Sequence, residues 1–199
     1  MSVAHSIACD PAPAGSKTAL RKALLASRQQ LVHDPARDAR FTDRIVDLLV
    51  ERAPRCVAIY WPIAGEFDPR PAIERWLAID TRAQSALPVV VERHAPMVFH
   101  AWRPGAPTRR GLFGIPVPEM PIDVEPDLLL IPCVGIDRAR FRLGYGGGFY
   151  DRTLAAFEAR GARRPIAVGV AFDVGRVDTL PREPHDVALD VGVSESGIW

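Results

Sequence analysis

Short, almost wholly apolar segments alternate along this chain with stretches of helical periodicity, and this alternation constrains the fold more than any other feature. The apolar segments at residues 56–60, 128–131 and 166–172 have the length of strands. A strand that is apolar on both sides needs a cover on both sides, as in a parallel sheet. The pattern therefore predicts an α/β fold of three layers, in which helices flank a mainly parallel sheet.

The other elements follow from local signals. Apolar residues recur at helical spacing in several segments, one of which has Asp34 as its cap and Pro35 at its first position. Helices are predicted at residues 16–32, 35–53, 71–79 and 149–160. Further strands are predicted at residues 85–91, 97–102 and 187–193. The stretch 104–121, rich in glycine and proline, is predicted to be one long loop.

The length of 199 residues suits one domain, and a chain of this size buries a core without disulfides or a structural metal. We expect residues 1–15 to form a disordered tail and residues 16–199 to form a single domain, because no repeat or linker divides them. The three cysteines are too few and too widely spaced for a disulfide framework, which indicates a reducing, cytoplasmic setting. No apolar run reaches the length of a membrane span.

The charge balance excludes some partners. With 25 Lys+Arg against 24 Asp+Glu, the net charge of +1 gives no field that would attract nucleic acid or a membrane surface. An RNA-binding module is disfavoured further, because aromatic and basic residues do not interleave. We interpret Lys22, Arg28 and the arginine pairs at 109–110 and 163–164 as ordinary solvated charge.

The segment 137–152, which reads DRARFRLGYGGGFYDR, carries the clearest chemical signal. It lies between a predicted strand and a predicted helix. Its glycines lack a Cβ, so backbone N–H groups can approach an anion closely at the positive end of the helix that follows. Arg142 would add a planar fork to phosphate oxygens, and Asp151 would hold a magnesium ion with them.

A structural alternative stays open for this segment. It would be a tight turn in which Asp151 complements the helix dipole and Arg142 pairs with a surface carboxylate. The segment lacks the Gly-Lys-Ser/Thr of a P-loop, and Phe149 stands where the dinucleotide pattern needs glycine. Any nucleotide here is held in some other way.

The segment RLGYGGGFYD at 142–151 resembles the signature of the 5-formyltetrahydrofolate cyclo-ligase family, whose core is Arg-Leu-Gly-x-Gly-x-Gly-Tyr-Tyr-Asp. Four more landmarks are similar to the family's and come in its order. They are Lys17 with Arg21, YWPIAGE at 60–66, GIPVP at 114–118 and LPREPHD at 180–186. The resemblance covers nearly all of the chain after residue 15.

The resemblance implies an α/β enzyme that is monomeric and cytoplasmic and has 5-formyltetrahydrofolate, with or without a polyglutamate chain, as substrate. With ATP as co-substrate and Mg²⁺ as cofactor, the enzyme would form 5,10-methenyltetrahydrofolate and release ADP and phosphate. A formamide oxygen is a poor leaving group, so the family's route transfers the γ-phosphoryl group to it before the folate amine closes the ring. Such a transfer depends mostly on positioning and charge stabilisation.

The resemblance also assigns roles to residues. ATP would be bound by Lys17, Arg21, Arg142, Gly144, Tyr145, Gly146, Gly147, Gly148, Phe149 and Tyr150. The folate would be bound by Trp61, Glu66, Tyr145 and Phe149, with Glu66 accepting hydrogen bonds from the pterin ring. Arg142 and Tyr150 would be catalytic, and Asp151 and Asp186 would bind the metal. His185 is left without a catalytic role.

Two departures from the family pattern keep rival functions open. Phe149 stands where many relatives have tyrosine, and Gly175 stands where they usually have glutamine. The loss of a polar contact at Gly175 would suit a non-catalytic folate-binding or regulatory paralogue. A second rival keeps the ATP site and acts on another small amide or carboxylate.

Overall fold

The computed structural model describes residues 15–161 and 163–199, and its centre is a six-stranded sheet in the order β11-β9-β6-β1-β2-β3. Five strands run parallel, and β3 pairs antiparallel with β2. The strands are β1 (Cys56–Ala58), β2 (Gln84–Val89), β3 (Val98–Ala101), β6 (Leu128–Pro132), β9 (Ile166–Val170) and β11 (Val191–Val193). The predicted mainly parallel α/β sheet is confirmed.

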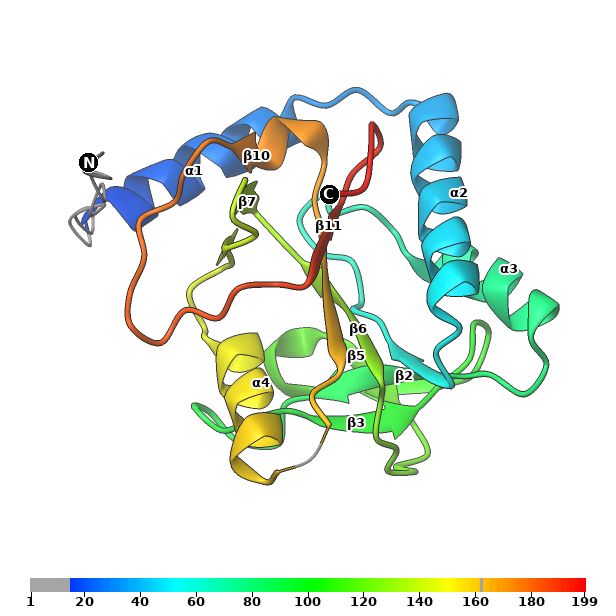
Figure 1. Ribbon diagram of the computed structural model, residues 1–199. Coiled ribbons are helices and arrows are strands. Elements are labelled where there is room, and N and C mark those ends of the chain that lie inside the picture. Colours follow the sequence, from blue (N-terminus) through cyan, green and yellow to red (C-terminus); the bar gives the residue numbers. More distant parts are fainter. Residues whose placement is uncertain (1–14, 162) are drawn as a thin grey trace, which may run out of the picture.

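Helices cover both faces of this sheet (Figure 1). Helices α2 (Pro35–Arg52) and α3 (Arg70–Ile79) pack on one face, and α4 (Phe149–Ala159) packs on the other. The strands serve both layers by alternation: Leu128 and Leu130 belong to the cluster under α2 and α3, and Leu129 and Ile131 to the cluster under α4. All four side chains are fully buried, which explains why the segment is apolar without a break.

Local signals set the ends of α2. The side chain of Asp34 accepts hydrogen bonds from the backbone N–H groups of Ala36 and Arg37, as expected of an N-cap, and Pro35 is the first helical residue. Ala53 ends the helix in the left-handed conformation, with φ of 45°, before Pro54. Helix α1 (Gly15–Gln29) ends earlier than predicted. The expected tail lies outside the described residues except for Gly15, which is helical.

Two small sheets accompany the large one. Strands β7 (Gly135–Asp137), β8 (Arg142–Leu143) and β10 (Arg176–Val177) form one of them, and its residues pack with α1. The other corrects the prediction of a single loop at 104–121, because β4 (Thr108–Arg110) and β5 (Pro116–Pro118) pair as a hairpin. Proline is tolerated there because a two-stranded ribbon consists only of edges. The short helices η1 (Leu112–Gly114) and η2 (Asp173–Gly175) complete the elements.

Candidate active site

A cavity of about 760 Å³ opens at the carboxyl ends of the central strands. Residues that follow β1 line it, and so do Pro88 and Val90 at the end of β2 and Pro132 at the end of β6. The chain passes from β1 to β2 on one side and later places β6 on the other, so β1 lies at a switch point of the sheet. Open α/β sheets bind ligands at such a point.

The structure brings every residue that the sequence singled out for a site to this one cavity. The lining includes Lys17, Arg21, Trp61, Glu66, Arg142, Gly144, Tyr145, Gly146, Gly147, Gly148, Phe149, Tyr150, Asp151 and Asp186. These residues come from α1, from the loop after β1, from β8 and the glycine loop, from α4 and from the loop before β11. Residues 183 and 185, to which no role was assigned, line it as well.

The glycine loop depends on conformations that other residues adopt only with strain. Gly146 has φ of 96° and Gly148 has φ of 64°. A Cβ at Gly144 would lie 2.8 Å from an Nη atom of Arg142, so the missing side chain leaves room for the guanidinium. Arg21 fixes the start of the loop, because its Nε donates to the Gly144 carbonyl at 2.7 Å. The loop therefore presents its backbone to the cavity at the N-terminus of α4.

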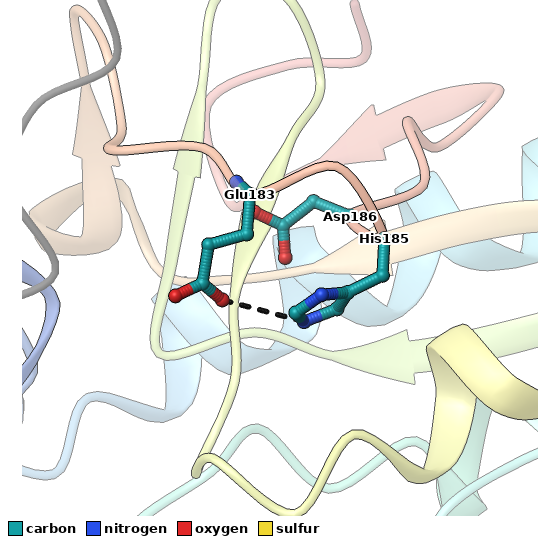
Figure 2. Close-up of side chains that lie close together, drawn as sticks. All are labelled: Glu183, His185 and Asp186. Carbon is teal, nitrogen blue, oxygen red and sulfur yellow. Dashed lines mark hydrogen bonds and ion pairs between the residues drawn. The ribbon is translucent and has the colours of Figure 1, made fainter.

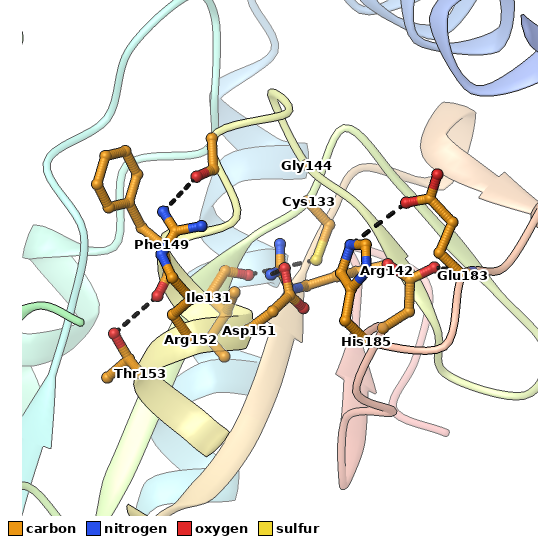
Figure 3. A network of polar contacts seen from close by, with 12 residues as sticks. Ile131, Cys133, Arg142, Gly144, Phe149, Asp151, Arg152, Thr153, Glu183 and His185 are labelled. Atoms are coloured by element: carbon orange, nitrogen blue, oxygen red, sulfur yellow. Dashed lines mark hydrogen bonds and ion pairs between the residues drawn. The ribbon is translucent and has the colours of Figure 1, made fainter. Parts of the chain in front are cut away.

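Arg142 and Asp151 form the most buried ion pair of the cavity (Figure 3). Arg142 Nη2 donates to Asp151 Oδ2 at 2.6 Å, and the two side chains are 7% and 16% exposed. The alternative of a surface pair is therefore wrong, although the pairing itself is present. The guanidinium carbon of Arg142 also lies 5.6 Å from the centre of the Tyr150 ring. Burial raises the pKa of Tyr150, so its hydroxyl stays protonated at neutral pH.

Lys17 joins α1 to the loop before β11. Its Nζ lies 2.7 Å from Asp186 Oδ2 and 3.0 Å from Glu183 Oε2. Burial disfavours the charged amine, but the hydrogen bonds that Lys17 donates to the two carboxylates, together with their charges, outweigh it and raise the pKa of Lys17. Figure 2 shows His185 beside Glu183, and its Nε2 lies 3.3 Å from Glu183 Oε2. Glu183 thus lies beside Asp186, at the place where the sequence predicted a metal-binding carboxylate from Asp186 alone.

Asp137 holds the chain that leads to Glu183 in place through hydrogen bonds. Its side chain is fully buried, and one carboxylate oxygen accepts hydrogen bonds from the backbone N–H groups of Ala139 and Phe141, each at 2.9 Å. The other oxygen accepts from Leu180 N at 3.1 Å and from Arg182 Nη2 at 3.2 Å. One carboxylate therefore ties the β7–β8 connection to the chain that leads to Glu183. Asp137 begins the segment 137–152 singled out in the sequence, but no role was predicted for it, since an aspartate at the end of a strand carries no special pattern.

Glu66 lies on a tight turn after β1. Its Oε2 accepts a hydrogen bond from Ile63 N at 2.9 Å, and within the described residues its buried Oε1 has no hydrogen-bond partner. Burial raises the pKa of Glu66, opposed by the Ile63 N–H, by the Tyr145 hydroxyl and by the charge of Arg28. Near this turn, the guanidinium carbon of Arg70 lies 4.6 Å from the centre of the Trp61 ring. A carboxylate with one unpaired, buried oxygen can accept N–H donors from a ligand.

Two expectations from the sequence need correction. Arg28 is not solvated surface charge, because it is only 6% exposed and donates through Nη2 to the Tyr145 hydroxyl. Gly175 does not line the cavity, and a Cβ there would lie 2.9 Å from the Val134 carbonyl oxygen. The glycine at 175 is therefore required by close packing of η2 against the start of β7. Lys22 is exposed, as predicted.

Fold and cavity together define an α/β protein with a glycine loop at the N-terminus of a helix, beside an aromatic and acidic pocket. The sequence pattern of the 5-formyltetrahydrofolate cyclo-ligase family matches residues 13–195. A 5-formyltetrahydrofolate cyclo-ligase from Mycolicibacterium smegmatis is 32% identical over 184 residues, covering 87% of this chain and 91% of the relative. One from Haemophilus influenzae is 31% identical over 156 residues, covering 74% and 80%.

Solved structures agree. The 5,10-methenyltetrahydrofolate synthetase of Aquifex aeolicus superposes with a TM-score of 0.71 at 28% identity, covering 92% of this chain and 91% of that one. The synthetase of Mycoplasma pneumoniae gives a TM-score of 0.70 at 26% identity, covering 89% and 97%. The chain belongs to the 5-formyltetrahydrofolate cyclo-ligase family, and is thus a ligase of one-carbon folate metabolism; membership implies the use of ATP.

One matching relative, from Arabidopsis thaliana, is described as mitochondrial. Among the described helices of this chain, none is long and apolar enough to cross a membrane.

Proposed function

We propose that this protein cyclises 5-formyltetrahydrofolate to 5,10-methenyltetrahydrofolate at the expense of ATP, releasing ADP and phosphate. One observation carries the proposal, namely that a single cavity combines two kinds of site. One side has the glycine loop with its buried cations, and the other has Trp61 and the Glu66 carboxylate, of which one oxygen has no hydrogen-bond partner among the described residues. Phosphoryl transfer from ATP to a folate needs the nucleotide site and the folate site next to each other.

The chemistry follows from the weakness of the formyl group as an electrophile. The formyl oxygen attacks the γ-phosphorus of ATP, and the bond to the β-phosphate oxygen breaks, which releases ADP. The neighbouring folate amine then attacks the formyl carbon, loses its proton, and phosphate departs with the original formyl oxygen. The protein supplies alignment and positive charge rather than a nucleophile.

On the phosphate side, we assign Lys17, Arg21, Arg142 and the loop glycines 144, 146, 147 and 148 to the nucleotide. The support is their convergence on one cavity and the positive φ of Gly146, a conformation that a residue with a side chain would adopt only with strain. Arg142 would stabilise the charge of the transferred group, and the protonated Tyr150 hydroxyl would donate a hydrogen bond within the site. Tyr145 and Phe149 would lie against both substrates, since both line the cavity.

Magnesium suits the acidic side of the same cavity. Asp151 and Asp186 offer hard carboxylate oxygens, the ligand type that Mg²⁺ prefers, and each side chain is 16% exposed. Both carboxylates are paired with cations that we assign to phosphate, so they would hold Mg²⁺ when ATP draws those cations away. Bound there, the ion would neutralise phosphate charge and align the γ-phosphoryl group.

We further propose that residues 16–199 act as one catalytic domain, in the cytoplasm and as a monomer. Every residue that we assign to the site lies between α1 and the loop before β11, within this single domain. Cys56 and Cys133 are free, buried thiols, as suits a reducing compartment. Gly175 is closely packed and does not line the cavity, so this departure from the family pattern gives no direct support to a non-catalytic paralogue.

A spectroscopic assay tests the function. The purified protein is mixed with 5-formyltetrahydrofolate and Mg-ATP, and the near-ultraviolet absorbance of the methenyl product is followed, with ATP omitted as control. We expect the band to grow only with ATP. A flat trace with tight formyl-folate binding would indicate a binding protein, and a flat trace without binding but with ATP turnover on another amide or carboxylate would indicate another acceptor.

A further inference from the structure

Arg28 is a buried cation that the proposed chemistry leaves unused. It lies in the last turn of α1, is 6% exposed, and does not line the cavity. Its Nη2 donates to the hydroxyl of Tyr145, and its guanidinium carbon lies 5.8 Å from the centre of the Tyr145 ring. Within the described residues its Nε is buried without a hydrogen-bond partner. Burying a guanidinium is costly, so this arrangement calls for a compensating role.

The positive charge of Arg28 acts on Tyr145 and on Glu66. Tyr145, which touches Arg28, feels the Glu66 carboxylate strongly enough that burial and this charge together raise its pKa to about 12. Burial raises the pKa of Tyr60, Tyr150 and Cys133, and the charge of Glu66 adds to this effect, so all three are neutral near pH 7. Among the described residues that act on Glu66 through charge, Arg28 is the cation.

We infer that Arg28 is a positioning residue for the folate ring: through the Tyr145 hydroxyl, its guanidinium holds the phenol in place and keeps Glu66 in the form that accepts hydrogen bonds. The inference rests on the proposed function, in which the pterin edge donates to the unpaired Oε1 of Glu66. A protonated Glu66 would offer a donor to a ligand edge that is itself a donor. Arg28 therefore contributes to the selection of a ring with adjacent N–H groups, without touching it.

The test compares Arg28→Met, Arg28→Lys and Tyr145→Phe with the wild type by calorimetric binding of 5-formyltetrahydrofolate without ATP, between about pH 5.5 and pH 8. Arg28→Met is expected to weaken binding by about 10-fold near neutral pH. It should also move the pH at which affinity is lost on acidification upward by about one unit, because an opposite charge no longer favours ionised Glu66. The KM for ATP should change less than about twofold.

Arg28→Lys is expected to restore the pH midpoint, because it restores the charge, and to recover only part of the affinity. Tyr145→Phe removes the hydroxyl that accepts from Arg28, and it does so on a partly exposed ring. It therefore tests the link from Arg28 to Glu66 even if Arg28→Met lowers stability. Tyr145→Phe should weaken folate binding, and it should shift the pH midpoint less than Arg28→Met does. Arg40→Met, which removes an exposed arginine of α2, should match the wild type.

If the wild type binds the folate, two outcomes would overturn this inference alone. In the first, Arg28→Met binds the folate as tightly as the wild type and its affinity has the same pH midpoint. In the second, Arg28→Met loses folate and ATP affinity equally at every pH, as a merely structural role would give. Failure of the wild type to bind 5-formyltetrahydrofolate would instead remove the proposed function, and this inference with it.

Discussion

The Nζ of Lys17 lies 2.7 Å from Asp186 Oδ2, so a cation that we assign to the nucleotide neutralises a carboxylate that we assign to the metal. Arg142 and Asp151 repeat the relationship at 2.6 Å. We propose that each pair would exchange partners when Mg-ATP binds, with the cations pairing with phosphate and the carboxylates holding the ion. The cavity can therefore hold four charged side chains without the full cost of leaving any of them unpaired.

Replacing Lys17 by methionine should raise the KM for ATP by about 10-fold or more, because a charge-assisted hydrogen bond to phosphate is lost. The KM for the folate should change much less. Lys22→Met is the matched control, since Lys22 is an exposed lysine of the same helix. Steady-state kinetics with each substrate varied in turn provide the measurement. Equal effects of the two variants would contradict the assignment of Lys17.

Replacing Arg142 by methionine should lower the free energy of unfolding by about 3 kcal/mol, because Asp151 is left in a mostly buried position without its partner. Arg138→Met breaks the ion pair with Asp178, whose side chains are 83% and 82% exposed, and should cost less than about 1 kcal/mol. Urea unfolding of both variants measures the difference. Similar midpoints for the two would mean that the Arg142 pair contributes no more than a surface pair.

Gly146→Ala should abolish most ATP binding, because an L side chain at φ of 96° displaces the loop backbone. Gly161→Ala is the control: Gly161 also has a positive φ, 63°, but has open space around it and does not line the cavity. Both changes should cost about 1 kcal/mol of stability. Only Gly146→Ala should alter nucleotide affinity, as measured by calorimetry with Mg-ATP. Loss of affinity in both would assign the effect to stability alone.

Glu66→Gln should stabilise the protein near neutral pH while weakening folate binding. Burial raises the pKa of Glu66 above its unfolded value, so the favourable contribution of its protonated form is present below about pH 4.3 and is lost as the pH rises through the folded pKa. The gain from Glu66→Gln should therefore be largest near pH 7 and shrink toward pH 4.

Thermal unfolding across this pH range checks the sign, with the exposed Glu119→Gln as control. A variant that is less stable than the wild type at neutral pH would contradict the account. The Glu66→Gln variant should also raise the KM for the folate far more than the KM for ATP, since the new side chain would offer the ligand an amide in place of a charged oxygen.

The sequence predicts those parts of the fold and site whose signals are local. Asp34 followed by Pro35 is sufficient to start α2, because cap and first residue act within one turn. Likewise the glycines between a strand and a helix predict a glycine loop there, because the conformations at Gly146 and Gly148 favour that residue type. Both features therefore agree with their predictions to within a residue or two.

What could not be predicted depends on distant contacts. Arg28 is buried by Tyr145, which lies 117 residues away, and composition alone suggested a surface charge. A signal was present, since Lys17, Arg21 and Arg28 follow a spacing of four and seven residues that places them on one helix face. Glu183 and Asp137 carry no such pattern, and only the folded chain brings them to the site.

The most direct test of the account is to follow the formyl oxygen. 5-Formyltetrahydrofolate labelled there with a heavy oxygen isotope is converted with Mg-ATP, and the released phosphate is analysed by mass spectrometry. Phosphorylation of the formyl oxygen predicts one labelled oxygen in each phosphate and one ATP consumed for each methenyl product formed. Unlabelled phosphate, or methenyl product formed without ATP, would contradict the central claim.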